Sequence, residues 1–281
     1  IGVVLWICHI MGLAVFCILA GADVLLREWG RRRSWLSALA LTALAMLPLA
    51  AGPALGLLFG DGAAPGTLFE YRHASRKLLW LAETLRDRWQ LWDIASSLFL
   101  IAVAAGLWRS DKFELDRGLA AGALLLLLAF ALSPEIIMGS AYADMRLTPV
   151  VLMLFLIAVR PSPGCDPRLA ARVAVVALLF CGARLGGNAV SLLMFDSQAR
   201  QSLAVLDAVP RHANLVTIPV SRCRDADNGW TMERRKHLSG YAVARRHAFD
   251  NGQWNMPGGQ VLQVHNPSAR PFEKDPLPVV F

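Results

Sequence analysis

The chain has 281 residues, of which 56% are hydrophobic and only 17% are charged. Soluble domains carry about 25% charged residues, so this composition excludes an ordinary soluble protein. The net charge of +7 does not indicate a nucleic-acid partner, because the basic residues cluster at the ends of long apolar blocks, where they report topology. The five cysteines show no metal-ligand spacing, so neither a metal site nor a disulfide framework is expected.

The apolar blocks predict a mainly α fold, a polytopic transmembrane helix bundle of about six spans within residues 1–194. In chain order the expected spans are residues 1–26, 35–59, 93–108, 118–134, 143–159 and 169–194. The chain starts at Ile1 inside an apolar run and without a methionine. We therefore expect further helices upstream in a longer protein.

Three short basic loops fix the expected orientation. They follow the first, third and fifth spans and contain Arg27, Arg31, Arg32, Arg33, Arg109, Lys112, Arg117, Arg160, Arg168 and Arg172. By the positive-inside rule these loops are cytoplasmic. Loops 60–92 and 134–146 and the tail from Phe195 are then expected outside.

The loop 60–92 contains a helical pattern. Leucine and tryptophan recur at helical spacing, opposite a charged face, at Leu78, Leu81, Leu85, Trp89 and Trp92. This spacing predicts an amphipathic helix over about 67–92, lying on the external membrane surface.

The tail, residues 195–281, predicts a small external α/β domain. Asp196 is expected to cap a helix that ends before Pro210. A strand over 214–220, a helix over 237–249 and a strand over 260–264 follow. A domain of this size has a marginal core, so it is expected to rest on the bundle.

Asp144 and Arg146 are the first candidate site residues, since charge at membrane depth defaults to a functional hypothesis. Asp144 is the candidate catalytic residue, orienting an arginine or an acceptor hydroxyl. Arg146 is a candidate phosphate ligand, because its fork matches phosphate oxygens. Glu135 and Tyr142 share the loop and are further substrate-binding candidates. The alternative is a structural helix-end pair, in which the arginine snorkels into the headgroup zone.

Arg184 interrupts the sixth span. Asn188 and Ser191 follow at i+4 and i+7, so the three residues share a helix face. This stripe predicts that Arg184 points into the bundle and contacts Asp144 or Glu135, binding substrate together with Asn188. A purely structural ion pair is the alternative.

Arg72 belongs to a basic run at residues 71–77 beside the predicted surface helix. Such a run suits a lipid-linked pyrophosphate. Nonspecific contact with anionic headgroups is the alternative.

The charged external loops, the surface helix and the small α/β tail together resemble the GT-C class of integral membrane glycosyltransferases. The stretches Tyr-Ala-Asp-Met-Arg-Leu at 142–147 and His-Leu-Ser-Gly-Tyr-Ala-Val-Ala-Arg-Arg-His-Ala-Phe at 237–249 also look like uncharacterised bacterial inner-membrane proteins related to that class. The resemblance implies sugar transfer from a polyprenyl-phosphate donor on the external face. The class carries its catalytic acid in its first external loop, whereas the first readable external loop here begins at Gly60.

The predicted function is therefore transfer of a sugar from a polyprenyl-phosphate donor to an extracytoplasmic acceptor. The expected location is the bacterial inner membrane, with a periplasmic C-terminal domain and membrane lipids as partners. No cofactor is indicated. A transporter or flippase is the first alternative, although the inverted repeats typical of that class are not evident. A noncatalytic membrane scaffold is the second.

Overall fold

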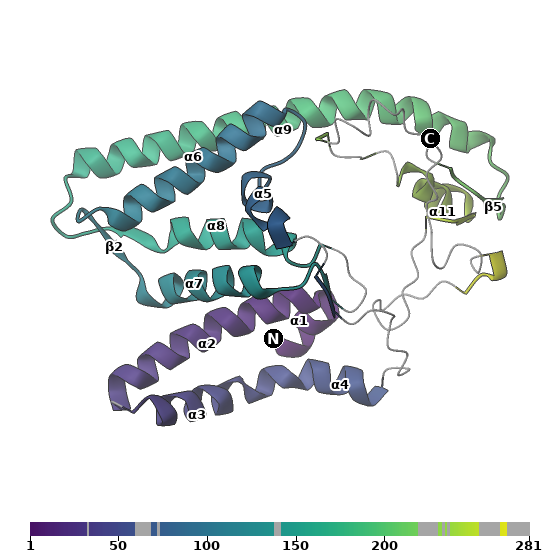
Figure 1. The fold of residues 1–281 in the computed structure, drawn as a ribbon. Coiled ribbons are helices and arrows are strands. Elements are labelled where there is room, and N and C mark those ends of the chain that lie inside the picture. Colours follow the sequence, from purple (N-terminus) through teal and green to yellow (C-terminus); the bar gives the residue numbers. More distant parts are fainter. Residues whose placement is uncertain are drawn as a thin grey trace. The chain divides into compact units, whose positions relative to one another are not determined.

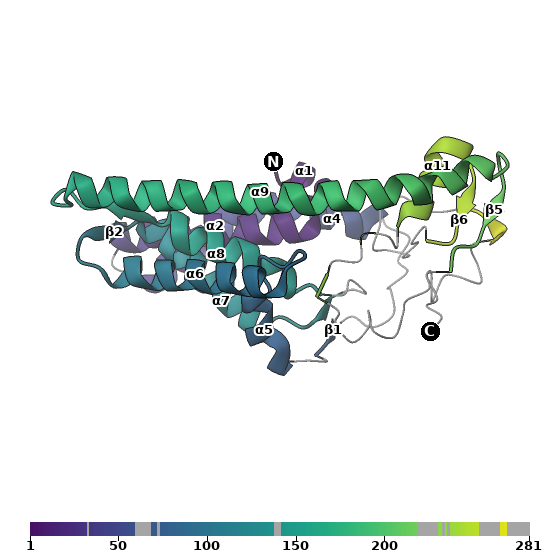
Figure 2. The same ribbon diagram turned by 90° about the horizontal axis from the view of Figure 1, so that it is seen from above.

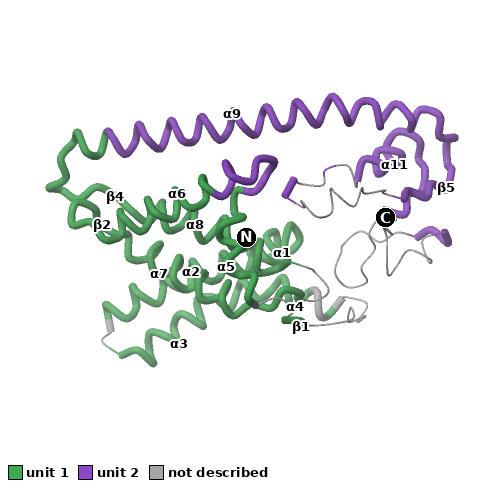
Figure 3. The backbone as a smooth tube through the Cα atoms, turned by 45° about the horizontal axis from the view of Figure 1, so that its top comes forward, with its two compact units in different colours: residues 1–85, 95–171 green, residues 86–94, 172–281 purple. Residues whose placement is uncertain are grey.

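The computed structural model describes residues 1–32, 34–59, 69–71, 74–137, 142–218, 230–231, 234, 237–252 and 265–268. The fold is mainly helical (Figure 1). It divides into two compact units, shown in Figure 3. Unit 1 contains residues 1–85 and 95–171, and unit 2 contains residues 86–94 and 172–281.

Four helical segments in the described parts of the chain are long and apolar enough to cross a membrane, at Ile10–Arg31, Trp35–Leu55, Gln90–Arg109 and Pro167–Ala208. Two further apolar helices, Arg117–Leu132 and Met145–Ile157, are shorter. These are the helices of a membrane protein, as the composition predicts. The count of six spans stays a prediction, because a bilayer core about 30 Å thick needs roughly 20 helical residues.

The helices of unit 1 begin with α1 (Gly2–Cys8) and α2 (Ile10–Arg32), so the expected first span is broken. His9 adopts an extended backbone between them, and its Nδ1 accepts a hydrogen bond from the Met11 amide. The helices that follow are α3 (Trp35–Met46), α4 (Ala51–Phe59), α5 (Lys77–Ala82), most of α6 (Gln90–Arg109), α7 (Arg117–Leu132) and α8 (Thr148–Ile157). A 3-10 turn, Leu47–Ala50, joins α3 to α4.

The core of unit 1 lies between α7 and α8 and is closed by Trp80 of α5. Leu126, Phe130, Val151 and Leu154 are among its other buried members. Helix α2 packs against the opposite side of α7. There Gly122 permits close approach, since a Cβ at this position would lie 2.5 Å from Leu19 Cδ2. Small residues serve this purpose where helices cross in membranes.

Two short antiparallel ladders join the loops of unit 1. Strand β1 (Phe69–Glu70) pairs with β3 (Ile136–Ile137), and β2 (Phe113–Leu115) pairs with β4 (Val159–Pro161). The first ladder joins the two loops expected outside, and the second joins two of the basic loops. Loops assigned to the same side by charge are therefore hydrogen-bonded to each other.

The continuous amphipathic helix expected over 67–92 is wrong. The described residues there form β1, a 3-10 turn at Ala74–Arg76, the short helix α5 and a bend that ends where α6 begins at Gln90. Side chains of α6 end the helical hydrogen bonding. The amide of Leu85 donates to Ser97 Oγ, and that of Asp87 donates to Asp93 Oδ2. These acceptors replace the carbonyls that a longer helix would have supplied.

The longest described helix is α9 (Pro167–Val205), a single helix of 39 residues that lies in unit 2 from Arg172 onward (Figure 2). Its length is about 58 Å at 1.5 Å per residue, so the expected sixth span and the expected tail helix are one element. Asp196 is not a helix cap. Its carboxylate pairs instead with Arg200, one turn further along α9. No glycine or proline interrupts the helix near this position, so nothing in the local sequence ends it.

The tail continues with 3-10 turn Leu206–Ala208, strand β5 (Asn214–Leu215), 3-10 turn Leu238–Gly240, helix α11 (Tyr241–Arg246) and strand β6 (Phe249–Asp250). Strands β5 and β6 are parallel, which requires a crossover, and α11 belongs to it. Leu206, Ala242 and Ala248 form the small apolar core between these elements. The strand expected at 260–264 lies outside the described residues.

Candidate functional site

Asp144 and Arg146 do not form one site. Asp144 is 2% exposed, whereas Arg146 is exposed. The Asp144 carboxylate caps the 3-10 turn Met145–Leu147, with Oδ1 accepting from the Met145 amide at 2.8 Å. Its Oδ2 lies 3.4 Å from Lys77 Nζ. The acid therefore pairs with a lysine of α5 rather than acting with its neighbour in sequence.

Lys77 also binds the end of α7. Its ammonium donates to the Phe130 carbonyl at 2.7 Å and to the Ser133 carbonyl at 2.6 Å. Tyr71 Oη donates to the Leu132 carbonyl at 2.9 Å. The last carbonyls of a helix lack intrahelical donors and carry partial negative charge. We call Tyr71, Lys77 and Asp144, with these carbonyls, the α7 cap; its contacts stabilise a helix end.

The other loop candidates surround the α7 cap. Tyr142 is exposed, has a φ of 57° and packs edge-on against Trp80 with ring centroids 5.9 Å apart. Glu135 extends the β1–β3 ladder, donating its amide to the Glu70 carbonyl and accepting from the Ala143 amide. Arg72 lies outside the described residues.

Arg184 of α9 is only 8% exposed, and its acidic partner is Asp93 rather than the expected Asp144 or Glu135. Arg184 Nη1 donates to Asp93 Oδ1 at 2.8 Å. The buried face of α9 is narrower than expected, because it includes Ser191 but not Asn188, which is exposed. The partner was missed because Asp93 was read as the edge of a span. Counting from the basic helix ends places both residues at a similar depth, roughly 25 Å along their helices, but it does not show that the two helices are neighbours.

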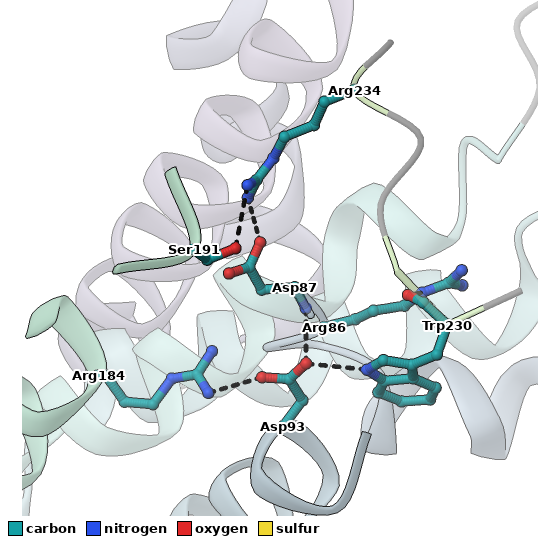
Figure 4. Close-up of polar contacts among 7 residues, drawn as sticks. All are labelled: Arg86, Asp87, Asp93, Arg184, Ser191, Trp230 and Arg234. Carbon is teal, nitrogen blue, oxygen red and sulfur yellow. Dashed lines mark hydrogen bonds and ion pairs between the residues drawn. The ribbon is translucent and has the colours of Figure 1, made fainter. Parts of the chain in front are cut away.

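Asp93 is fully buried in the first turn of α6 and uses both carboxylate oxygens. Besides Arg184 on Oδ1, its Oδ2 accepts from Trp230 Nε1 and from the Asp87 amide, each at 2.8 Å (Figure 4). One carboxylate thereby joins α6, α9, the bend before α6 and the tail. A buried carboxylate with this many donors is a fixed element of the structure.

Asp87 is bound differently. Arg234 of the tail donates to Asp87 Oδ1 and, at 3.1 Å, to Ser191 Oγ (Figure 4). Asp87 is 7% exposed, and within the described part of the chain its Oδ2 is buried without a hydrogen-bond partner. An unpaired buried carboxylate oxygen is unfavourable, so Asp87 Oδ2 has the capacity to accept a further hydrogen bond.

Aromatic rings cover the three arginines around these acids. Arg86 donates to the Trp230 carbonyl at 2.7 Å and lies 5.3 Å from the centroid of that indole. Arg184 lies 5.7 Å from the Trp92 ring and Arg234 lies 6.0 Å from the Phe195 ring. Such cation–π contacts hold guanidinium planes in place while leaving in-plane N–H donors for other partners.

We call this set the membrane-edge cluster. Its members are Arg86, Asp87, Asp93, Arg184, Ser191, Trp230 and Arg234, all within unit 2. Arg184 contacts Asp93 and Arg234 contacts Asp87, while Arg86 is bound to the Trp230 carbonyl. The cluster can bind an anionic group and accept a hydrogen bond from a hydroxyl. Among the described residues no group of histidine, cysteine, aspartate and glutamate is suited to hold a metal ion.

A further buried acid lies in the tail. Asp250 is 1% exposed and accepts hydrogen bonds from Thr217 Oγ1 at 3.2 Å and Ser239 Oγ at 3.1 Å. Burial raises the pKa of Asp250, while these hydroxyls and His237 oppose that change. Its neighbour Asn251 exchanges two hydrogen bonds with the Thr217 backbone. These contacts hold the segments after β5 and β6 together.

No protein family, curated protein or solved structure matches the chain. The functional argument therefore rests on the geometry of these clusters.

Proposed function

We propose that the chain is part of a membrane glycosyltransferase that takes a sugar from a polyprenyl-phosphate donor, and that the membrane-edge cluster is its active site. The observation that carries the proposal is Asp87 Oδ2, which is buried without a hydrogen-bond partner among the described residues, on a carboxylate that Arg234 also contacts. A glycosyl transfer from a lipid phosphate needs both features, an acceptor for a hydroxyl proton and cations for a leaving phosphate.

The reaction divides these roles among named residues. Asp87 Oδ2 accepts the proton as the acceptor hydroxyl attacks the anomeric carbon. The new carbon–oxygen bond forms there, while the bond from that carbon to the donor phosphate breaks and the phosphate keeps the electron pair. Arg234, which contacts Asp87, and Arg86, which precedes Asp87 in the chain, stabilise the phosphate charge as it develops. Asp93 holds Arg184 and Trp230 in position, so it acts as a positioning residue.

The proposal replaces Asp144 by Asp87 as the candidate catalytic residue and gives Asp87 the role of base. Asp144 already accepts from Lys77 and from the Met145 amide, so its lone pairs serve the fold. Arg146 is exposed next to the α7 cap, and its predicted role as a phosphate ligand stays a prediction. Arg72, Glu135, Tyr142 and Asn188 remain secondary candidates for substrate binding.

The test is product formation by membranes carrying Asp87→Asn, supplied with radiolabelled polyprenyl-phosphate sugars and normalised to the amount of folded protein. Loss of a general base lowers the rate by about 100-fold or more. Asp196→Asn is the matched control, since Asp196 is an acid of the same unit with an exposed side chain. Activity of Asp87→Asn within twofold of the unaltered chain contradicts the assignment.

We further propose that the tail is a small α/β domain on the periplasmic side of a bacterial inner membrane. The basic loops of unit 1 support this orientation by the positive-inside rule. Cysteine placed at Ser202 or Ser268 is expected to react with an impermeant reagent in intact cells whose outer membrane is open. Labelling only after the inner membrane is permeabilised reverses the orientation and removes the periplasmic assignment.

A noncatalytic scaffold is the second candidate. It is favoured by Asp93, both of whose oxygens are bound by the chain itself. A scaffold predicts that variants of the membrane-edge cluster change the amount of folded protein in proportion to any loss of product, with no residual effect after normalisation. The Asp87→Asn measurement therefore separates the two candidates.

A further inference from the structure

Unit 1 contains a cavity of about 460 Å³ that shares no residue with the membrane-edge cluster. It lies between α6, α7 and α8 and reaches α5. Its wall is mostly aliphatic, including Leu81, Ile101, Ala104, Leu127, Val151 and Leu152. Several of these side chains are partly exposed, so the cavity communicates with the surface of the helices.

The polar atoms in the wall already have partners inside the protein. Thr84 Oγ1 bonds to the Trp80 and Leu81 carbonyls, at 3.1 and 2.9 Å. Trp108 Nε1 donates to the Phe155 carbonyl at 2.7 Å. Thr84 and Trp108, the polar lining residues besides Arg109, therefore have their hydrogen bonds satisfied within the chain, and a hydrocarbon can lie against them without desolvating their polar atoms.

One cation stands at its edge. Arg109 is the last residue of α6, lines the cavity and is exposed. Its Nη1 makes a 3.3 Å contact with the Ala105 carbonyl, which leaves most of its N–H donors for a ligand. An apolar cavity with a single guanidinium at one end is complementary to a hydrocarbon chain that carries an anionic head.

We propose that this cavity binds one acyl chain of an anionic glycerophospholipid, with the lipid phosphate at Arg109. The position on α6 distinguishes this lipid from the proposed sugar donor. Asp93 stands in the first turn of α6 and Arg109 at its end, and 20 helical residues cover about 30 Å, the thickness of the hydrocarbon core. A phosphate at Arg109 belongs to the leaflet opposite the membrane-edge cluster. The bound chain supplies packing contacts that an empty cavity lacks.

The experiment uses the full chain in phosphatidylcholine nanodiscs that contain a phosphatidylglycerol with a diazirine at the end of one acyl chain. After photolysis, mass spectrometry locates the label. We expect it on α6 and α8 residues of the cavity wall, and we expect excess unlabelled phosphatidylglycerol to displace it. Labelling spread evenly over the outer faces of the helices overturns the proposal.

Two variants with matched controls sharpen the test. Ala105→Phe fills the cavity and is expected to reduce labelling of the wall by about fivefold or more. Ala102→Phe adds the same ring to an exposed position of α6 and is expected to leave labelling within twofold. Unchanged labelling in Ala105→Phe overturns the cavity as the site. If that variant does not fold, displacement from the unaltered chain decides alone.

Arg109→Gln tests the headgroup. It is expected to lower the preference for phosphatidylglycerol over a matched phosphatidylcholine probe by about fivefold, the contribution of one arginine near an anionic surface. Arg168→Gln, at the start of α9, is the control for a general loss of basic charge. Equal labelling by both lipids in the unaltered chain overturns the anionic assignment.

A photoreactive residue at Leu152 tests the competing occupant. Crosslinks to residues 172–194 instead of lipid show that α9 of the same chain fills the cavity, and they overturn the proposal. These outcomes are independent of product formation by Asp87→Asn, so failure here leaves the proposed function standing.

Discussion

The α7 cap and the membrane-edge cluster both place acidic and basic side chains in an apolar surrounding. They differ in how completely the chain satisfies their hydrogen-bond donors and acceptors. In the α7 cap one ammonium satisfies two carbonyls and a carboxylate. In the membrane-edge cluster Arg184 pairs with Asp93 and Arg234 pairs with Asp87, and one buried oxygen of Asp87 has no partner among the described residues. The comparison teaches that charge in a membrane protein indicates a ligand only where the chain leaves hydrogen-bonding capacity unused.

The largest expected effect follows removal of Arg184. Arg184→Met leaves Asp93 buried without its guanidinium, which costs about 3–5 kcal/mol of stability. The thermal unfolding midpoint of the purified chain in detergent measures it. Arg200→Met is the control, because the Arg200–Asp196 pair is exposed, and its midpoint is expected not to move. Equal midpoints for both variants would show that the membrane-edge cluster does not hold unit 2 together.

Removal of Lys77 should have the next largest effect. Lys77→Met leaves the Phe130 and Ser133 carbonyls and the Asp144 carboxylate without their shared donor, at a cost of about 2–3 kcal/mol. The same unfolding measurement applies. Arg76→Met is a suitable control, since Arg76 is exposed and stacks on the Trp80 ring at 4.8 Å, a contact worth about 0.5–1 kcal/mol. If Lys77→Met lowers the unfolding midpoint less than Arg76→Met does, Lys77 does not cap α7.

Asp144 and Arg146 should behave as unrelated residues. Asp144→Asn keeps an acceptor for the Met145 amide but loses the charge opposite Lys77, so we expect a loss of about 1 kcal/mol. Arg146→Gln is expected to change stability by less than about 0.5 kcal/mol, as at other exposed positions. Product formation in the same membranes supplies the decisive comparison. If both variants abolish the product while Asp87→Asn does not, the active site lies at the α7 cap and the contrast between the clusters is reversed.

The smallest effect concerns the pH dependence of stability through Asp250. Because burial raises its pKa, the folded tail binds this proton more tightly than the unfolded chain does. This contribution to stability is greatest below the unfolded pKa of about 3.9 and is lost as pH rises through the folded pKa. Unfolding midpoints of the unaltered chain and of Asp250→Asn, compared across that range, measure it. If the difference between the two midpoints does not change with pH, protonation of Asp250 does not contribute to the stability of the tail.

Much of the helix layout could be predicted from the sequence. Long apolar runs mark α2, α3, α6, α7 and α9, because a chain without water must satisfy its backbone within helices. The predicted helix boundaries were wrong where the hydrogen bonds of a side chain decided how far a helix extends. Asp93 and Ser97 end the helix expected over 67–92 by accepting amides of the bend. Asp196 resembles a cap by residue type, but its carboxylate is engaged by Arg200 within an uninterrupted helix.

The candidate site shows the same division. Periodicity along α9 marked Arg184 and Ser191, which are buried, because a helix face is a local property of spacing. Their partners could not be predicted from local spacing. Asp93 is 91 positions away from Arg184, and Arg234, which donates to both Ser191 and Asp87, is 147 positions away from Asp87. Such pairs depend on which helices are neighbours, and no local pattern records that.

The sequence by itself determined that this is a helical membrane protein, where its apolar helices run and which loops share a side. Hydrophobic length and the distribution of arginine and lysine encode these properties directly. Only the tertiary structure decided which charged groups have their hydrogen bonds satisfied within the chain and which keep an acceptor without a partner among the described residues. Lys77 reaches Asp144 and Arg234 reaches Asp87 through packing of distant segments, so the difference between a helix cap and a candidate active site exists only in the folded chain.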